Sequence, residues 1–269
     1  MFDIEVVPVP MIINEITYRD GIDITPTGFY AMLRKSKKMP TTSASSPTPY
    51  LEAYKNASHK ARNILCLTEP AKFSAMYNSA RTAVEMAKNT LHDMTIEVIE
   101  CTTAAAGQGL VALAAARTAA LDNPLEEVKK TVLSVMSKVN LFATLDTLQY
   151  LARSGRVPQA VALVNSILSI KPVFTLNHAD PRTVALPRTM KSAIDRILKL
   201  MCASVKKGQQ LHVAVMHADA IGEATTLKDR ITSQFECQEI YITEFTPVMG
   251  VHTGPGLVGV AFYGEENPS

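Results

Sequence analysis

The sequence of 269 residues lacks a strong excess of charge of either sign, and it lacks a long apolar run. A formal net charge of +2 provides no strong field to recruit nucleic acid or an anionic membrane. The longest stretch of low charge, Gly107–Leu121, is interrupted by Arg117 and is too short to span a bilayer. We therefore expect neither nucleic-acid binding nor integral membrane association.

Cysteine is also scarce, and its spacing excludes two further classes of protein. The four cysteines lie far apart and form no C-x-x-C pair, which argues against a zinc site and against a small disulfide-linked scaffold. The first residues, Met1–Glu5, include two acids where a secretory signal would have basic residues. These features predict a cytoplasmic protein with reduced thiols and no metal site.

Common catalytic signatures are missing as well. The sequence contains no G-x-x-x-x-G-K-[ST], no G-x-S-x-G and no H-E-x-x-H motif. Gly254–Gly259 spells G-x-G-x-x-G, but a dinucleotide site needs a helix directly after it, and Leu257–Tyr263 predicts a strand. We therefore expect no catalytic residue set and no nucleotide cofactor.

What the sequence does have is a regular alternation of strand-like and helix-like segments. Short β-branched or apolar runs such as Asn63–Leu67 and Thr95–Ile99 alternate with longer helical segments, and hydrophobic residues make up 47% of the chain. This order predicts an α/β fold with mainly parallel sheets. A helix that stops at Gly155 suggests a division into two domains, residues 1–155 and 156–269.

Polar segments recur at the predicted ends of these elements. They are Pro40–Ser43, the strand-to-helix junction Leu67–Ser79 with Ser74, Arg153–Arg156, and the Gly-rich loop Val248–Gly256 with His252. Ligands of open α/β sheets bind at the carboxyl ends of strands. Hydroxyl groups, an imidazole and a guanidinium can all donate hydrogen bonds to an anion, so together they predict a site for a carboxylate.

Each of these residues taken alone also has a purely structural explanation. Ser74 suits a helix N-cap, and Arg156 could cap the carbonyl groups at a helix end. His217 with Asp219 forms a weak pair that fits a loop-capping role better than a catalytic one. Only the joint occurrence of Ser74 and Arg156 with Thr42 and His252 favours a ligand site.

Four segments, in this order, resemble motifs of the DegV family of bacterial fatty-acid-binding proteins. The family patterns are P-x-T-S-Q-P-S, L-S-G-T-Y-x-S-A, L-x-Y-L-x-x-G-G-R-[VI] and H-x-G-P-G. The corresponding segments here are Pro40–Ser45, Phe73–Ala80, Leu148–Val157 and His252–Gly256. The resemblance extends over essentially the whole chain.

The resemblance implies two α/β domains with a long-chain fatty acid in a cleft between them. It implies that the protein is not itself an enzyme but presents the fatty-acid carboxylate to a separate fatty acid kinase, which makes acyl phosphate for phospholipid synthesis. The fatty acid would be the ligand, with no further cofactor. The apolar segment Ala160–Ile170 predicts a helix, and its pattern fits either a wall that faces the acyl tail or an ordinary core helix. The fatty-acid-binding residues implied by the motifs are Thr42, Ser43, Ser74, Arg156, His252, Thr253 and Gly254.

The chain departs from the family pattern in its first half. The first family strand, with its V-x-D-S-T-A-D-like motif, is expected to be absent. Pro70-Ala71 replaces a Ser-Ser pair, Ala75 and Met76 replace Gly and Thr, and Ala44 and Ser45 replace Gln and Pro.

Two other functions stay open: a small-molecule hydrolase or transferase with His252 as acid or base, and a lipid sensor that does not pass its ligand on.

Overall fold

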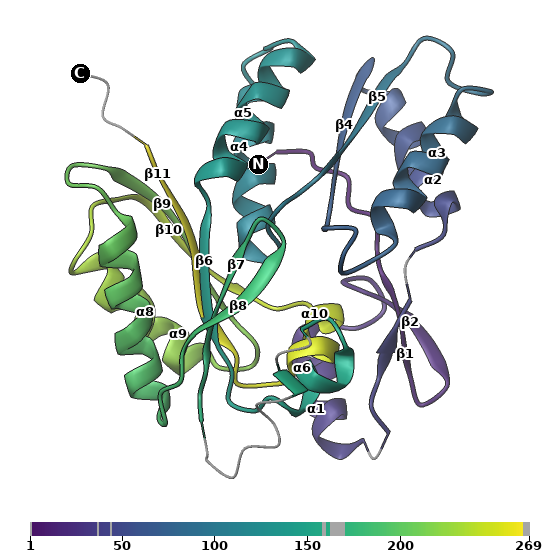
Figure 1. Ribbon diagram of the computed structural model, residues 1–269. Helices are drawn as coiled ribbons and strands as arrows, with labels where there is room; N and C mark the ends of the chain where they lie inside the picture. The colour runs from purple at the N-terminus through teal and green to yellow at the C-terminus, as the bar shows by residue number, and fades with distance from the viewer. Residues whose placement is uncertain (1, 37, 44, 158–159, 162–169, 266–269) are drawn as a thin grey trace.

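The predicted α/β class is confirmed by the computed structural model, which describes residues 2–36, 38–43, 45–157, 160–161 and 170–265. Helices cover both faces of one large sheet, and two smaller sheets lie beside it (Figure 1). Most of the expected helix Ala160–Ile170 falls outside these described residues.

The large sheet has six strands in the order β10-β9-β11-β6-β7-β8. Their bounds are β6 Asn140–Thr144, β7 Val173–Asn177, β8 Asp180–Ala185, β9 Gln210–His217, β10 Cys237–Glu244 and β11 Val258–Glu265. Helices α8 (Met190–Ser204) and α9 (Ile221–Thr232) pack on one face, and α4 (Ala106–Ala119) packs on the other beside α5 (Leu125–Lys138).

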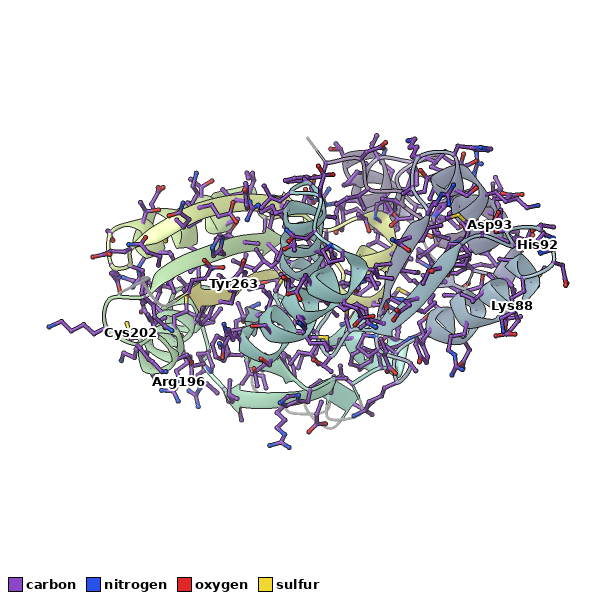
Figure 2. The ribbon with its side chains drawn as sticks, turned by 90° about the horizontal axis from the view of Figure 1, so that it is seen from above. Lys88, His92, Asp93, Arg196, Cys202 and Tyr263 are labelled. Carbon is purple, nitrogen blue, oxygen red and sulfur yellow. The ribbon has the colours of Figure 1, made fainter. Side chains whose placement is uncertain are left out.

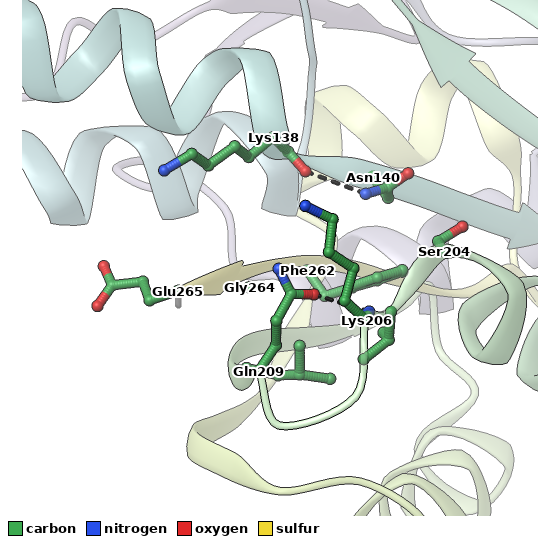
Figure 3. Close-up of a pocket in the computed structure, with 10 residues that line it drawn as sticks. Lys138, Asn140, Ser204, Lys206, Gln209, Phe262, Gly264 and Glu265 are labelled. Atoms are coloured by element: carbon green, nitrogen blue, oxygen red, sulfur yellow. Dashed lines mark hydrogen bonds between the residues drawn. The ribbon is translucent and has the colours of Figure 1, made fainter. Parts of the chain in front are cut away.

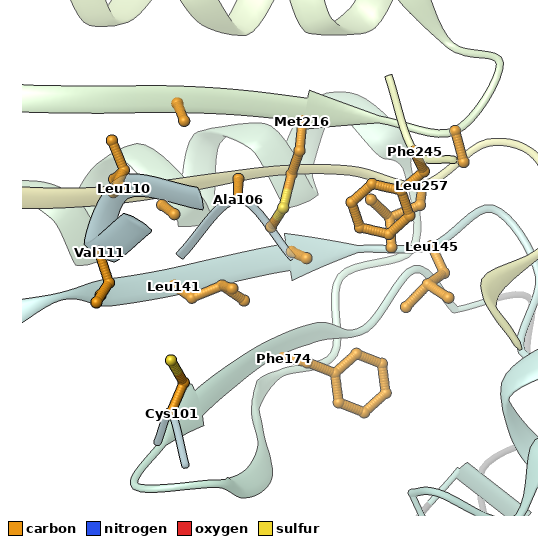
Figure 4. Packing of buried hydrophobic residues seen from close by; sticks show 14 of the residues in the cluster. Cys101, Ala106, Leu110, Val111, Leu141, Leu145, Phe174, Met216, Phe245 and Leu257 are labelled. Carbon is orange, nitrogen blue, oxygen red and sulfur yellow. The ribbon is translucent and has the colours of Figure 1, made fainter. Parts of the chain in front are cut away.

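Side chains along β9 point alternately to the two faces of the sheet, so they pack into two different hydrophobic clusters. Leu211, Val213 and Val215 point into the cluster shared with α8 and α9, whereas Met216 joins the cluster shared with α4. Figure 4 shows Met216 with other members of this second cluster, which also includes Leu110 of α4. A strand covered on both faces favours apolar side chains, as in the run Val213–Met216 of β9.

The first part of the chain forms two smaller sheets. Strands β4 (Asn63–Thr68) and β5 (Thr95–Glu100) pair in parallel and are covered by α2 (Pro47–Ser58) and α3 (Met76–Ala87). Strands β1 (Pro10–Ile13), β2 (Ile16–Arg19) and β3 (Thr41–Thr42) form a three-stranded sheet, and α1 (Pro26–Lys35) lies between β2 and β3 in sequence. Viewed from above, the molecule is elongated, with Lys88, His92 and Asp93 at one end and Arg196 and Cys202 at the other (Figure 2).

The predicted predominance of parallel pairing needs correction, because among the described strands only β9 with β10 and β4 with β5 are parallel. All other pairings between the described strands are antiparallel, including β7 with β8 and β11 with both of its neighbours. Strands β7 and β8 form a hairpin, and the connection from β10 to β11 contains only the short helix α10 (Pro247–Thr253). Alternation of helices and strands therefore does not fix strand direction.

The division near Gly155 stays a prediction. Helix α6 (Gln149–Ser154) does end there, and Gly155 adopts a left-handed φ of 71° that suits glycine. Strand β6 precedes this point but pairs with β7 and β11, so it shares a sheet with strands from the second half of the chain.

Candidate functional site

His252 lies on a short helix rather than in the loop that its Gly-rich surroundings predicted. Helix α10 spans Pro247–Thr253, with Pro247 in its first turn and His252 in its last. Proline suits a first turn because its fixed φ is helical and its missing N–H would have no partner there. Helix α10 packs against α1 and α6, and the three helices lie together beside the lower part of the six-stranded sheet (Figure 1).

Residues from the start of the chain fix the beginning of α10. The Asp20 carboxylate accepts a hydrogen bond of 3.2 Å from the Val248 backbone N–H. The Tyr30 hydroxyl donates to the Phe245 carbonyl at 3.3 Å. Gly250 lies so close to Phe29 and Tyr30 that a Cβ atom would stand 2.5 Å from the Phe29 ring. The position of His252 therefore depends on segments more than 200 residues away in sequence.

Gly254 ends α10 in a conformation that only glycine adopts readily, with φ of 67° and ψ of −180°. A Cβ atom at this position would stand 2.2 Å from the ring of Tyr150 on α6. The backbone after His252 and the aromatic ring of α6 are thus in direct contact. This contact holds α10 next to the start of α6, the helix that Arg156 follows.

The imidazole of His252 meets the hydroxyl group of Thr42. Their atoms Nε2 and Oγ1 lie 3.0 Å apart. Thr42 is held in place because β3 pairs with β1, with Thr42 opposite Met11. Thr42 and His252 were predicted to share one site, and the fold brings these two side chains together.

Burial and the nearby Arg156 together lower the pKa of His252 to about 4, so its ring is neutral at pH 7. The Nδ1 atom of His252 is buried and has no hydrogen-bond partner among the described residues. When the ring proton is on Nδ1, the Thr42 hydroxyl donates to Nε2 and the Nδ1–H group is left to donate elsewhere. Buried polar atoms of this kind are normally satisfied, which favours a ligand acceptor at this point.

Arg156 follows the left-handed turn at Gly155, and its guanidinium donates to the Ser154 carbonyl at 2.6 Å. This bond is the helix-capping contact that the sequence allowed. The group also stays within electrostatic range of His252 and Glu69. It therefore supplies positive charge at the site while it closes α6.

Ser74 lies in the turn between β4 and α3. Its backbone N–H donates to the Pro70 carbonyl at 3.3 Å, and its half-buried hydroxyl forms no hydrogen bond within the described part of the chain. The N-cap position of α3 belongs to Ala75, so Ser74 does not cap this helix. Its hydroxyl is thus available for a ligand.

Three other residues that were predicted to contact the ligand have fewer groups available to bind it. The Ser43 side chain is exposed, and its backbone N–H donates to the Pro10 carbonyl at 3.1 Å. The Thr253 hydroxyl donates within its own helix to the Met249 carbonyl at 3.0 Å, so only its backbone remains for a ligand. Gly254 acts through its close packing on Tyr150.

Glu69, which no sequence motif singled out, follows β4 in the same turn as Ser74. Burial raises the pKa of its carboxyl group, and the Arg156 charge opposes this shift. Asp20 and Tyr150 were also missed, because their roles arise only from contacts across the fold. His217 has the predicted capping role: its Nδ1 accepts from the Ala220 N–H at 3.4 Å.

Other features of the described residues do not compete with this site. A hollow of about 520 Å³ opens at the opposite end of the large sheet, lined by Lys138, Gln209 and Glu265 among others (Figure 3). Within the described ranges, no group of three or more His, Cys, Asp or Glu side chains could hold a metal ion. None of the helices described is long and apolar enough to cross a membrane.

A family model described as an uncharacterised protein of the DegV family matches residues 1–265. The chain belongs to the DegV family. A DegV domain-containing protein of Caldanaerobacter subterraneus is 29% identical over 261 residues, which are 97% of this chain and 91% of the relative. The predicted family membership is confirmed.

Solved structures of DegV proteins share the fold. One is described as a fatty-acid-binding DegV-family protein of Thermus thermophilus; it has 26% identity and a TM-score of 0.89, covering 97% of this chain and 91% of that one. Another is DegV of Bacillus subtilis, described as a fatty-acid-binding protein, with 25% identity and a TM-score of 0.85 over 96% and 91% of the two chains. The two-domain α/β architecture of these DegV proteins is therefore the architecture of this chain.

Proposed function

We propose that this DegV-family chain binds one long-chain fatty acid, with the carboxylate held by Thr42, Ser74, Arg156 and His252. The observation that carries the proposal is the 3.0 Å contact between Thr42 and His252 beside an unpartnered, buried Nδ1 atom. Support comes from the structural relatives of Thermus thermophilus and Bacillus subtilis, both described as fatty-acid-binding.

The donors of the proposed site suit a carboxylate. A neutral imidazole with its proton on Nδ1, the Ser74 hydroxyl and the Arg156 guanidinium can each donate to an anionic oxygen. Ser43, Thr253 and Gly254 would border the same site through their backbone. For the tail, roughly 0.8 kcal/mol per buried CH₂ gives a C16 chain about 11 kcal/mol of gross driving force before ordering costs.

We further propose that the bound carboxylate is presented to a separate fatty acid kinase in the cytoplasm, which forms the acyl phosphate for phospholipid synthesis. The chain would then be a binding subunit rather than the catalyst. Its modest net charge of +2 is compatible with a soluble carrier that meets a protein partner.

Mass spectrometry of lipid extracted from the purified protein tests the binding proposal. One fatty acid per chain is the expected result, and its mass identifies the preferred tail. A protein that carries no lipid and ignores added fatty acids would contradict the proposal. Acyl-phosphate formation by a fatty acid kinase, with and without this protein, tests the presenting role separately.

The alternative, a hydrolase or transferase that uses His252, has less support. Thr42 and His252 do have the spacing of a nucleophile and its base. However, a pKa of about 4 makes His252 a weak base at neutral pH, and no described residue orients its Nδ1 atom. Turnover of an ester or phosphate panel that disappears in His252→Ala would reverse this preference.

A further inference from the structure

Helix α10, which carries His252, is capped by a residue from the start of the chain. The side chain of its own N-cap residue, Thr246, accepts no hydrogen bond from the first turn of the helix. The Asp20 carboxylate does so instead, because it accepts from the backbone N–H of Val248, the second residue of α10, at 3.2 Å. An N-cap side chain normally accepts from the second or third N–H group of its helix. Asp20 thus fills the role of an N-cap, although 228 residues separate it from Val248.

The surroundings of the Asp20 carboxylate favour this role. The group is half-buried, and burial raises its pKa, whereas hydrogen bonds from the Thr246 side chain and the Val248 backbone lower it. Buried polar groups are costly unless they are hydrogen-bonded, so the beginning of α10 compensates the burial of Asp20. An acidic side chain at this end of a helix also interacts favourably with the helix dipole. The contact therefore stabilises both partners.

A closed turn holds Asp20 in place. The Arg19 guanidinium binds both oxygens of Asp23, at 3.0 Å from Nε and 2.9 Å from Nη2, and the Arg19 backbone N–H donates to the same carboxylate at 2.7 Å. The N–H groups of Ile22 and Asp23 donate back to the Arg19 carbonyl at 3.2 and 3.0 Å. Asp20 is therefore presented to α10 from a segment whose backbone is tied at several points.

The sheet that carries this turn also carries Thr42. Strand β1 is the middle strand of the order β2-β1-β3. On one side, the Asp20 N–H, just after β2, donates to the Val9 carbonyl at 3.0 Å. On the other side, the Ser43 N–H, next to Thr42 of β3, donates to the Pro10 carbonyl at 3.1 Å. Two neighbouring carbonyl groups of one chain segment thus hold the backbones of Asp20 and Thr42 relative to each other.

We propose that the three-stranded sheet sets the geometry of the Thr42–His252 pair, with Asp20 as the positioning residue that ties His252 to this sheet. Thr42 belongs to the sheet itself, and Asp20 holds the start of α10, where Val248 lies one helical turn before His252. Without the cap, the first turn of α10 should loosen, and the 3.0 Å contact between Thr42 and His252 should be made less often. A carboxylate would then meet donors that are no longer pre-aligned. The effect on binding rests on the proposed function, whereas the effect on His252 does not.

Titration of lipid-free protein with palmitic acid measures the effect on binding. Asp20→Ala removes the capping acceptor and should weaken binding by about tenfold, within the range expected for the loss of an N-cap. Asp20→Asn keeps an oxygen acceptor at the same place and should stay within about threefold of the natural chain. Asp93→Ala, at an exposed end of the molecule, is the matched control and should leave affinity unchanged (Figure 2). Affinity in Asp20→Ala equal to that of the natural chain would overturn the positioning role.

A double-mutant cycle separates the positioning of His252 from general support of the fold. In the His252→Gln background, Asp20→Ala should weaken binding by less than about twofold, because the group that it positions is already gone. The same loss in both backgrounds would show that Asp20 acts on the fold as a whole, and the proposal would be wrong. Urea unfolding checks that each variant is folded under the conditions of the titration. If Asp20→Ala does not fold, Asp20→Ser, whose hydroxyl group is one bond shorter than the carboxylate, takes its place in the cycle.

The ring of His252 gives a second readout that needs no lipid. NMR titration of the imidazole should give a pKa of about 4 in the natural chain, where burial and Arg156 lower it. In Asp20→Ala, a looser α10 exposes the ring more, so its pKa should move up towards 6.5, whereas Asp20→Asn should keep the low value. An unchanged pKa in Asp20→Ala would contradict the tie between Asp20 and His252. If the natural chain binds no palmitic acid but the ring responds in this way, the proposed function fails and the positioning role stands.

Discussion

The six-stranded sheet and the two-stranded sheet differ in how completely they are covered. Every residue of β9 from Leu211 to His217 is buried, as is β11 from Val258 to Tyr263. In the small sheet, only Thr68 of β4 is buried, and no residue of β5 is. Burial on this scale sets local stability, so the large sheet should open far less often.

The candidate site draws on both regions. His252 lies on α10, which leads directly into β11 of the large sheet, whereas Ser74 and Glu69 follow β4 of the small one. One side of the proposed headgroup site is thus held by a densely packed layer, and the other by a more loosely covered one. Such a pairing lets a ligand order the looser side while the firmer side keeps its geometry.

The largest loss of stability is expected from a substitution of Gly254, on the densely packed side of the site. Gly254→Ala places a Cβ atom against Tyr150 in a backbone conformation reserved for glycine, and we expect a loss of unfolding free energy on the order of 3 kcal/mol. Urea unfolding measures it. Gly222→Ala on α9, where a Cβ atom meets nothing within 4 Å, is the control and should change stability by less than about 1 kcal/mol. Equal losses in both variants would show that the contact with Tyr150 is unimportant.

His252 should make the lipid-free protein sensitive to acid. Its pKa is lowered from 6.5 to about 4 by burial first and by Arg156 second. As pH falls from 6.5 towards 4, the unfolded chain binds a proton that the folded chain does not, so the unfolding free energy decreases by up to about 3 kcal/mol. His252→Gln should remove this slope from a series of urea titrations, whereas His59→Gln at an exposed position should not. A slope that persists in His252→Gln would assign the effect to other groups.

The contact between Thr42 and His252 should matter for binding more than for folding. Thr42→Ala removes a half-buried hydrogen-bond partner, which we expect to weaken fatty-acid binding by about 1 to 3 kcal/mol, or roughly 5- to 160-fold. Thr42→Ser keeps the hydroxyl group and should retain most of the affinity. Ser43→Ala, in the exposed neighbour, is the control in the same lipid titration. Unchanged affinity in Thr42→Ala would remove Thr42 from the site.

The smallest expected effect is that of an Ile→Val substitution, made once against each sheet to compare their contributions to stability. Ile197→Val on α8, fully buried against the large sheet, should cost about 1.5 kcal/mol. Ile96→Val in half-buried β5 should cost about 0.5 kcal/mol. Urea unfolding of the two variants side by side measures the difference. Equal costs would mean that the coverage of the two sheets does not differ in energy.

Local sequence was sufficient for several elements of the fold. Strands β4 and β5 lie where β-branched and apolar runs predicted them, and Gly155 ends α6 as expected. Strand direction was not predictable in this way, because it depends on pairing between segments far apart in the chain. The predicted loop around His252 is a helix because Asp20, Tyr30 and Tyr150 contact it, and none of these contacts is visible in the sequence around His252.

The candidate site shows the same limit. Motif resemblance selected Thr42 and His252, and the fold places them in contact. Glu69 has no motif of its own, and a carboxylate after a strand is common in exposed turns. Its significance comes from burial and from Arg156, both of which are properties of the folded chain.

The position of β11 has a consequence for how the protein is made. This strand follows all other described strands in sequence, yet it lies between β9 and β6 in the large sheet. On the ribosome, β6 and β9 would be synthesised before β11, the strand that joins them. Until β11 has been made, the edge of each strand that pairs with β11 would stay uncovered. A pause in translation before β11, or a chaperone that covers β9, should therefore determine how much of the newly made protein escapes aggregation.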